Sequence, residues 1–292
     1  ENTKLVIAIS SRALFNLDHS HKIFKEKGID AYAKHQQKNE HVVLEPGVGF
    51  TLVKKLLKLN SKKTPIDVIL LSRNSADTGL RIFNSIEHYD LNISRAAFTR
   101  GESTHPFVGA FEADLFLSSN YNDVQKALQS GYAAASIVES KSNNSHPSQL
   151  RIAFDGDAVI FSDEAERIFQ EKGLEAFHEN EILSEKIELK AGPFKSFLVS
   201  LQKIQSTFPE ENNPIRTALV TARSAPSHRR VIHTMREWGI RIDESFFLGG
   251  LEKGVFLKQF AADIFFDDQQ QHCESASQYV PTGHVPSGIK NS

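Results

Sequence analysis

The chain has 292 residues, of which 40% are hydrophobic and 24% charged, a composition typical of a globular protein with a sizeable core. A formal net charge of −2 gives no general attraction to nucleic acid or to an anionic membrane, so we expect neither as a partner. The single cysteine, Cys273, excludes an internal disulfide and Cys-rich zinc sites, which is typical of the cytosol. Residues 5–9 form a strand-length apolar run rather than a signal peptide, and no run reaches the length of a membrane span, so we expect a cytoplasmic protein.

The sequence contains two copies of one unit, each about 145 residues long. The first aligned block has no gap, and 11 of its 31 residue pairs are identical. The aligned blocks are 5–35 with 150–180, 65–72 with 214–221, and 111–119 with 260–268. We therefore expect two domains, 1–139 and 150–292, joined by a Ser- and Asn-rich linker at about 140–149.

Strands and helices are predicted to alternate along each unit, which favours an α/β fold with a mostly parallel sheet in each copy. In the second copy the expected strands are 151–154, 217–221 and 263–266, and the expected helices are 163–172, 194–206 and 227–238. The first of these helices is predicted to end at Gly173 and the last at Gly239. The stretch after Tyr279 has no clear periodicity, so both a loop that folds back and a disordered tail stay open.

Carboxylates stand at the expected carboxyl ends of two strands in the second copy, where ligands gather in α/β sheets. Asp155 and Asp157 flank Gly156, and side chains two residues apart in an extended segment point the same way. Gly156 allows a sharp turn and a close backbone approach to a ligand. Asp267 and Asp268 close the strand 263–266. These carboxylates can converge on one cation or one phosphoryl group.

The first copy has lost these acidic residues. Ser10 and Arg12 stand where the second copy has its first two aspartates, and Ser118 and Ser119 stand where it has the last two. If the carboxylates only capped turns, both copies would tolerate them equally. The asymmetry indicates chemistry in the second copy and a structural or ligand-shaping role for the degenerate first copy, where Arg12 or Arg73 could hold a phosphate or a regulatory nucleotide.

The order of these pieces resembles the four motifs of the haloacid dehalogenase-like phosphatase superfamily. More narrowly, the chain resembles the cytosolic 5′-nucleotidase I family, and the resemblance covers nearly the whole sequence. It is carried by AFDGDAV at 153–159, VTARSA at 220–225 and IFFDDQ at 264–269, and in the first copy by SSRALF at 10–15 and FNSIEHYD at 83–90. The resemblance implies two duplicated haloacid dehalogenase-like (Rossmannoid) units, the first of them degenerate.

The resemblance and the chemistry of phosphoryl transfer together assign roles. Asp155 is expected to be the nucleophile that forms an aspartyl-phosphate, and Asp157 the general acid and then base. Thr221 and Lys253 are expected to bind the transferring group, with Lys258 as the rival lysine. Phosphate contacts are expected from Gly156, Ala222 and Arg223. Mg²⁺ is the expected cofactor because it prefers oxygen ligands, here the Asp155 carboxylate, the backbone carbonyl of Asp157, one or both of Asp267 and Asp268, and waters.

The predicted function is a Mg²⁺-dependent 5′-nucleotidase that hydrolyses nucleoside monophosphates such as AMP or IMP. Two alternatives stay open: a phosphatase of the same mechanism for a sugar phosphate, and a nucleotide-binding sensor without turnover. The intact acidic set argues against the sensor, because binding a phosphate requires no nucleophile. The resemblance also suggests a nucleotide effector, and a homo-oligomer is among the open assembly states.

Overall fold

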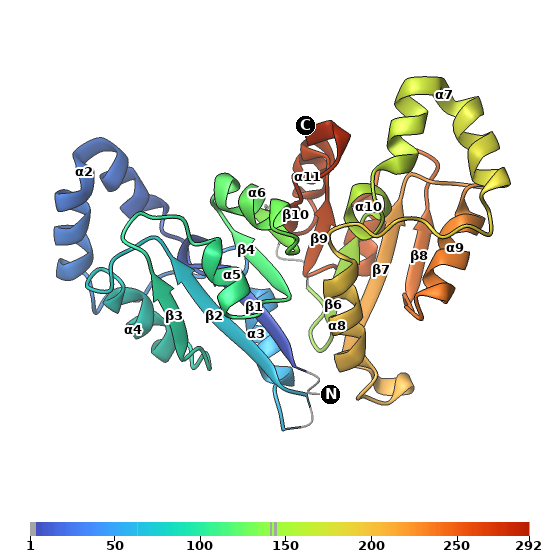
Figure 1. Cartoon of the computed structure of the whole chain (residues 1–292). Helices are drawn as coiled ribbons and strands as arrows, with labels where there is room; N and C mark the ends of the chain where they lie inside the picture. Colours follow the sequence, from blue (N-terminus) through green and yellow to red (C-terminus); the bar gives the residue numbers. More distant parts are fainter. Residues whose placement is uncertain (1–3, 63, 141, 143–144, 292) are drawn as a thin grey trace.

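The computed structural model describes residues 4–62, 64–140, 142 and 145–291. In this part of the chain ten strands form a single sheet in the order β3-β2-β1-β4-β5-β10-β9-β6-β7-β8 (Figure 1). The strands are β1 (Leu5–Ser10), β2 (Ile66–Ser72), β3 (Arg95–Phe98), β4 (Leu115–Ser118), β5 (Ala134–Val138), β6 (Leu150–Phe154), β7 (Ile215–Thr221), β8 (Glu244–Phe247), β9 (Ile264–Asp267) and β10 (Thr282–His284).

The strand order of the first half of the sheet is repeated in the second half. Counted from the outer edge, β3-β2-β1-β4-β5 corresponds to β8-β7-β6-β9-β10. Neighbouring strands are parallel except β5 and β10, which pair antiparallel and join the halves. We propose that these halves are the units 1–139 and 150–292, joined by 140–149, of which residues 141, 143 and 144 lie outside the described part of the chain.

Helices cover both faces of the sheet. They are α1 (Ser11–Leu14), α2 (Asp18–Lys38), α3 (Phe50–Leu59), α4 (Leu80–His88), α5 (Pro106–Ala110), α6 (Tyr121–Gln129), α7 (Glu164–Leu183), α8 (Lys195–Gln205), α9 (His228–Glu237), α10 (Gly254–Phe260) and α11 (Gln270–Ala276), with short helical turns at η1 (Gly156–Ile160), η2 (Glu210–Asn212) and η3 (Ile289–Asn291). Among the described residues, no helix is long and apolar enough to cross a membrane.

The core is continuous on one face of the sheet and divided on the other. On the continuous face, side chains of α3, α4, α8 and α9 pack against alternate residues of the strands in both halves. On the opposite face, α5 and α6 cover the first half, and α10 and α11 cover the second. Strands buried on both faces explain the nearly unbroken apolar runs in the sequence. The shared core holds the carboxyl ends of β6, β7 and β9 in fixed relative positions.

The sequence prediction of an α/β fold with a mostly parallel sheet is confirmed. The predicted strands correspond to β6, β7 and β9, and two of the predicted helices correspond to α8 and α9. The prediction of a helix end at Gly173 is wrong in part, because α7 resumes after a break there and continues to Leu183. The stretch after Tyr279 folds back, and its residues 282–284 form β10 between β5 and β9.

Helices α2 and α7, at opposite ends of the molecule (Figure 1), are broken by equivalent glycines. Gly28 has φ 80° and Gly173 has φ 83°, and a Cβ at either position would meet nothing within 4 Å. We therefore expect Gly173→Ala to lower the free energy of unfolding by about 1–2 kcal/mol through backbone strain, without a steric clash. Urea unfolding measures this, and Gly28→Ala is the matched control with the same expected loss. A neutral or stabilising effect at both positions would contradict the backbone argument.

Candidate active site

The site is built at the carboxyl ends of β6, β7 and β9. Asp155 follows β6 directly, and its backbone N–H donates to the carbonyl of Phe266 at 2.8 Å, which fixes it against β9. Gly156 brings the backbone close to the end of β7, since a Cβ there would lie 3.4 Å from Thr221 Oγ1. Thr221 is the last residue of β7, and its hydroxyl accepts the backbone N–H of Arg223 at 3.2 Å. The predicted strand-end positions therefore meet in space.

Three buried carboxylates face one another here. Oxygens of Asp155, Asp267 and Asp268 lie within 4.8 Å of one another. Lys253 Nζ, at the start of α10, lies 3.0 Å from Asp155 Oδ1 and 2.6 Å from Asp267 Oδ2. Lys258, the rival lysine, lies inside α10 and is exposed. The cluster thus contains three carboxyl groups against one ammonium group.

Burial and this imbalance of charge together shift the pKa values of the cluster. Burial, with the nearby carboxylates, raises the pKa of Asp155 to about 7, although Lys253 opposes the shift. Burial beside Asp155 and Asp267 raises the pKa of Asp268 to about 9. Burial also acts on Asp267, but Lys253 and His272 outweigh it and hold its pKa at about 2. Burial alone would lower the pKa of Lys253, but Asp155 and Asp267 raise it by more, so the lysine stays charged.

A divalent cation fits this donor set. Mg²⁺ prefers hard carboxylate oxygens, and Asp155, Asp267 and Asp268 offer them within one small volume. Burial raises the pKa of Asp155 and Asp268, and Lys253 opposes this shift without offsetting it. A bound cation would remove this penalty, as paired charges require. The buried acidic triad can therefore hold a metal ion.

The backbone of Asp268 is held by the tail of the chain. Its carbonyl accepts His284 Nε2 at 2.9 Å and Asn291 Nδ2 at 2.8 Å. These contacts explain why the stretch after Tyr279 folds back onto the sheet next to the acidic cluster. Sequence periodicity could not reveal it, because β10 has three residues.

Asp157 takes a different position from the other three aspartates. Its carboxylate binds Arg223 through two hydrogen bonds of 2.8 Å, from Nε and Nη2. Arg223 Nη1 also donates to Glu181 Oε2 at 2.5 Å, and Glu181 accepts from Arg230 at 2.9 Å. Glu181 is buried in the second part of α7, so this network ties α7 to the site.

These contacts change the expectation for Arg223. The sequence predicts that it binds phosphate, but its guanidinium donates to the carboxylates of Asp157 and Glu181 instead. The neighbouring Ala222 is exposed and can offer a phosphate only its backbone N–H, since its side chain is a methyl group.

Sequence reasoning missed Glu181 and Arg230. The signal was present in the repeat, because the first copy has Gln36 at the position of Glu181 and Arg81 at that of Arg230, and Arg81 donates to Gln36 at 3.1 Å. The first copy lacks the second arginine, since Asn74 stands where the second has Arg223. At these positions the second copy therefore has one more arginine than the first, and a carboxylate, Glu181, that pairs with it.

The fold and the site define a class: a Rossmann-like α/β protein of the haloacid dehalogenase-like type, with acidic groups at the ends of parallel strands. The chain belongs to the 5′-nucleotidase family, whose model matches residues 1–292. It is similar to human cytosolic 5′-nucleotidase 1B, with 39% identity in an alignment of 288 positions that covers 94% of this chain and 47% of that protein. The chain thus spans about half the length of this curated relative. No solved structure matches the chain.

Proposed function

We propose that the chain is a Mg²⁺-dependent 5′-nucleotidase that hydrolyses nucleoside 5′-monophosphates of the AMP or IMP type to nucleoside and phosphate. The observation that carries this proposal is the buried cluster of Asp155, Asp267, Asp268 and Lys253 in a chain of the 5′-nucleotidase family. The human relative is named as a cytosolic protein, and we propose the same compartment for this chain.

In the proposed reaction the Asp155 carboxylate attacks phosphorus, and the bond from phosphorus to the 5′-oxygen breaks. Asp157 gives its proton to the leaving oxygen, which releases the nucleoside. Water then attacks the aspartyl-phosphate and gives a proton back to Asp157, which restores both carboxyl groups and releases phosphate. The Thr221 hydroxyl and the Lys253 ammonium group orient the phosphoryl oxygens and stabilise their charge.

Asp157 must change partner to act as an acid. Both of its carboxylate oxygens accept from Arg223, whereas a general acid must donate to the leaving oxygen. We infer that the pair with Arg223 is the resting position of Asp157. An incoming phosphate dianion would compete for Arg223 and free Asp157 to turn toward the leaving oxygen.

Asp155, Asp267 and Asp268 would hold Mg²⁺, together with the backbone carbonyl of Asp157. When bound, the metal ion supplies the positive charge that allows a phosphate dianion to approach these carboxylates. At an effective dielectric constant of about 20, two like unit charges about 4 Å apart repel by about 4 kcal/mol, so this compensation is large.

Metal affinity is expected to increase steeply with pH. Protons compete with the metal for Asp155, with a pKa of about 7, and Asp268, with a pKa of about 9. Apparent Mg²⁺ affinity should therefore rise by at least about tenfold between about pH 6 and pH 8, with release of protons on binding. Calorimetry in two buffers of different ionisation enthalpy measures both quantities. A pH-independent affinity without proton release would contradict the assigned ligands.

The substrate class is tested by phosphate release from AMP, IMP, dTMP and a sugar phosphate with Mg²⁺. We expect the purine monophosphates to have the highest kcat/KM. A preference for the sugar phosphate would retain the mechanism and overturn the nucleotidase assignment. Tight AMP binding with no phosphate release under any metal condition would favour the sensor instead.

A further inference from the structure

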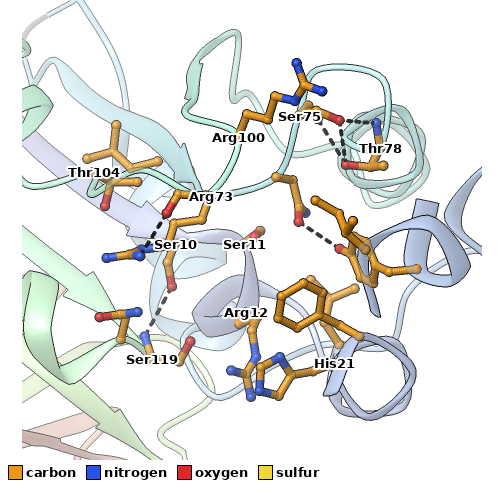
Figure 2. Close-up of a pocket in the computed structure, with 18 of the residues that line it drawn as sticks. Ser10, Ser11, Arg12, His21, Arg73, Ser75, Thr78, Arg100, Thr104 and Ser119 are labelled. Carbon is orange, nitrogen blue, oxygen red and sulfur yellow. Dashed lines mark hydrogen bonds between the residues drawn. The ribbon is translucent and has the colours of Figure 1, made fainter. Parts of the chain in front are cut away.

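The first half of the sheet carries a cavity of about 700 Å³ at the carboxyl ends of β1, β2 and β4. Figure 2 shows Ser10, Ser11, Arg12 and Ser119 together on one part of its wall. The cavity also reaches α2, which supplies His21 and the aromatic side chains of Phe24 and Tyr32. It lies at the position in the first copy that the acidic cluster occupies in the second.

Each residue of the acidic cluster, and Asp157 beside it, has an uncharged or oppositely charged counterpart in this cavity. In pairs of second copy and first copy, they are Asp155 and Ser10, Asp157 and Arg12, Lys253 and Thr104, Asp267 and Ser118, and Asp268 and Ser119. Four carboxylates and one ammonium group are thus replaced by one guanidinium group and four hydroxyl groups. At these five positions the net charge thus changes from negative to positive.

Arg12 has donor capacity to spare. Within the described residues its Nε is buried and has no hydrogen-bond partner. Its one ion pair with a described residue is a long contact of 3.4 Å from Nη2 to Asp18, whose side chain is 70% exposed. A buried N–H without a partner costs about 1–3 kcal/mol, so a ligand acceptor at this place would be favourable.

The charged groups that line the cavity balance in number, and among the described residues none of the others pairs with Arg12. Arg73 binds Asp123 through two hydrogen bonds, of 2.9 and 2.7 Å, so this pair is already neutral as a whole. Asp77 is exposed and accepts from the neutral Gln37 amide at 2.7 Å, which leaves its negative charge in place. The remaining two charged residues, Arg100 and Asp30, are exposed and carry opposite charges.

Hydroxyl groups next to Arg12 can complete an anion site. The Ser10 hydroxyl oxygen accepts backbone N–H groups of Ala13 and Ser119, both at 3.3 Å, which leaves its own proton for a ligand. Ser119 contributes a second hydroxyl on the same wall (Figure 2). A phosphoryl group, with several acceptor oxygens, matches one guanidinium group and two hydroxyl groups.

The far wall of the cavity is apolar. Phe24 is 44% exposed and Ile29 is 61% exposed, although both are large hydrophobic residues. The Phe24 ring meets Tyr32 edge to face at 6.0 Å. Such a wall favours a ligand with a planar apolar body beside its anionic group.

We propose that this cavity is a second binding site, which takes a small phosphate ester with a planar body and needs no metal ion. The Arg12 guanidinium and the hydroxyl groups of Ser10 and Ser119 bind the phosphoryl group, and Phe24 and Tyr32 pack against the body. The cavity has no carboxylate at the position of Asp155, so the ester is bound without being hydrolysed. The site is independent of turnover in the second half.

The test is calorimetric titration of the full chain with AMP, adenosine and inorganic phosphate in EDTA, where the acidic cluster repels anions. We expect AMP to bind with one site per chain and adenosine at least tenfold more weakly. Arg12→Gln should weaken AMP binding at least tenfold without lowering the melting temperature, since it removes an unsatisfied buried donor. Absence of metal-free AMP binding, or binding unchanged by Arg12→Gln, would overturn the proposal.

A matched pair of variants separates charge from shape. Ser119→Asp restores the carboxylate of the second copy and should weaken AMP binding at least tenfold, whereas Ser119→Asn has the same size without charge and should weaken it less than threefold. Equal losses in the two variants would show that anion recognition is not the basis of binding. Because no metal and no turnover are involved, this result is separate from the test of the nucleotidase assignment.

Discussion

Replacing Lys253 with methionine is expected to abolish activity and to lower the free energy of unfolding by about 3–5 kcal/mol at about pH 8, because it leaves buried carboxylates without their cation. Lys253 lies 3.0 Å from Asp155 and 2.6 Å from Asp267. The loss should be smaller at about pH 6, where the carboxyl groups, with pKa values raised further by the substitution, take up protons. Urea unfolding in EDTA at both pH values measures this difference.

The control for Lys253→Met is Lys203→Met in α8. Lys203 is exposed, and its replacement should change the free energy of unfolding by no more than about 0.5 kcal/mol. Added Mg²⁺ should restore part of the stability of Lys253→Met, because it supplies the missing positive charge. A loss of equal size at both pH values would contradict the electrostatic explanation of the cluster.

Replacing Asp155 with asparagine should lower phosphate release from AMP at least about a thousandfold, since the variant lacks the nucleophile. The same change should raise the stability of the metal-free protein at about pH 8. The folded-state pKa of Asp155, about 7, lies above the usual value for aspartate. As the pH rises between these two values, such a carboxyl group costs about 1.4 kcal/mol of stability for each pH unit. Thermal unfolding and a phosphate assay test the two parts.

Asp243→Asn is the control, because it is expected to lower stability and leave turnover unchanged, the opposite of Asp155→Asn. The Asp243 carboxylate accepts Thr217 N at 2.8 Å and Gln205 Nε2 at 2.7 Å, and these hydrogen bonds lower its pKa despite partial burial. We therefore expect this variant to lose stability and to keep its turnover. If Asp155→Asn also lost stability together with activity, a structural role for Asp155 would replace the proposed chemical role.

Much of the fold could be predicted because the two copies reinforce each other. Buried strands such as β6 and β7 read as apolar runs with turn residues at their ends, and the acidic residues after β6 and β9 could be placed at one edge of a parallel sheet. The cluster of Asp155, Asp267, Asp268 and Lys253 follows from that placement. The repeat also singled out the first copy, where the cavity with Arg12 lies.

The remaining features depend on contacts between distant segments. A glycine after a helical pattern predicts the end of the helix. The sequence does not show that α7 resumes beyond Gly173. The role of Arg223 depends on Asp157 and Glu181, which lie 66 and 42 residues away along the chain. The short β10 is held by pairing with β5 and β9 rather than by its own pattern. Tertiary partners of this kind leave no periodic signal.

The covalent step is the central claim, and rapid acid quenching during turnover tests it most directly. Protein mixed with Mg²⁺ and AMP carrying a labelled phosphate should hold the label on the peptide that contains Asp155 during the first turnover. The label should be absent from Asp155→Asn and should disappear from the wild-type protein as phosphate is released. Phosphate release with no protein-bound label at any time, or label on a different residue, would contradict the proposed mechanism.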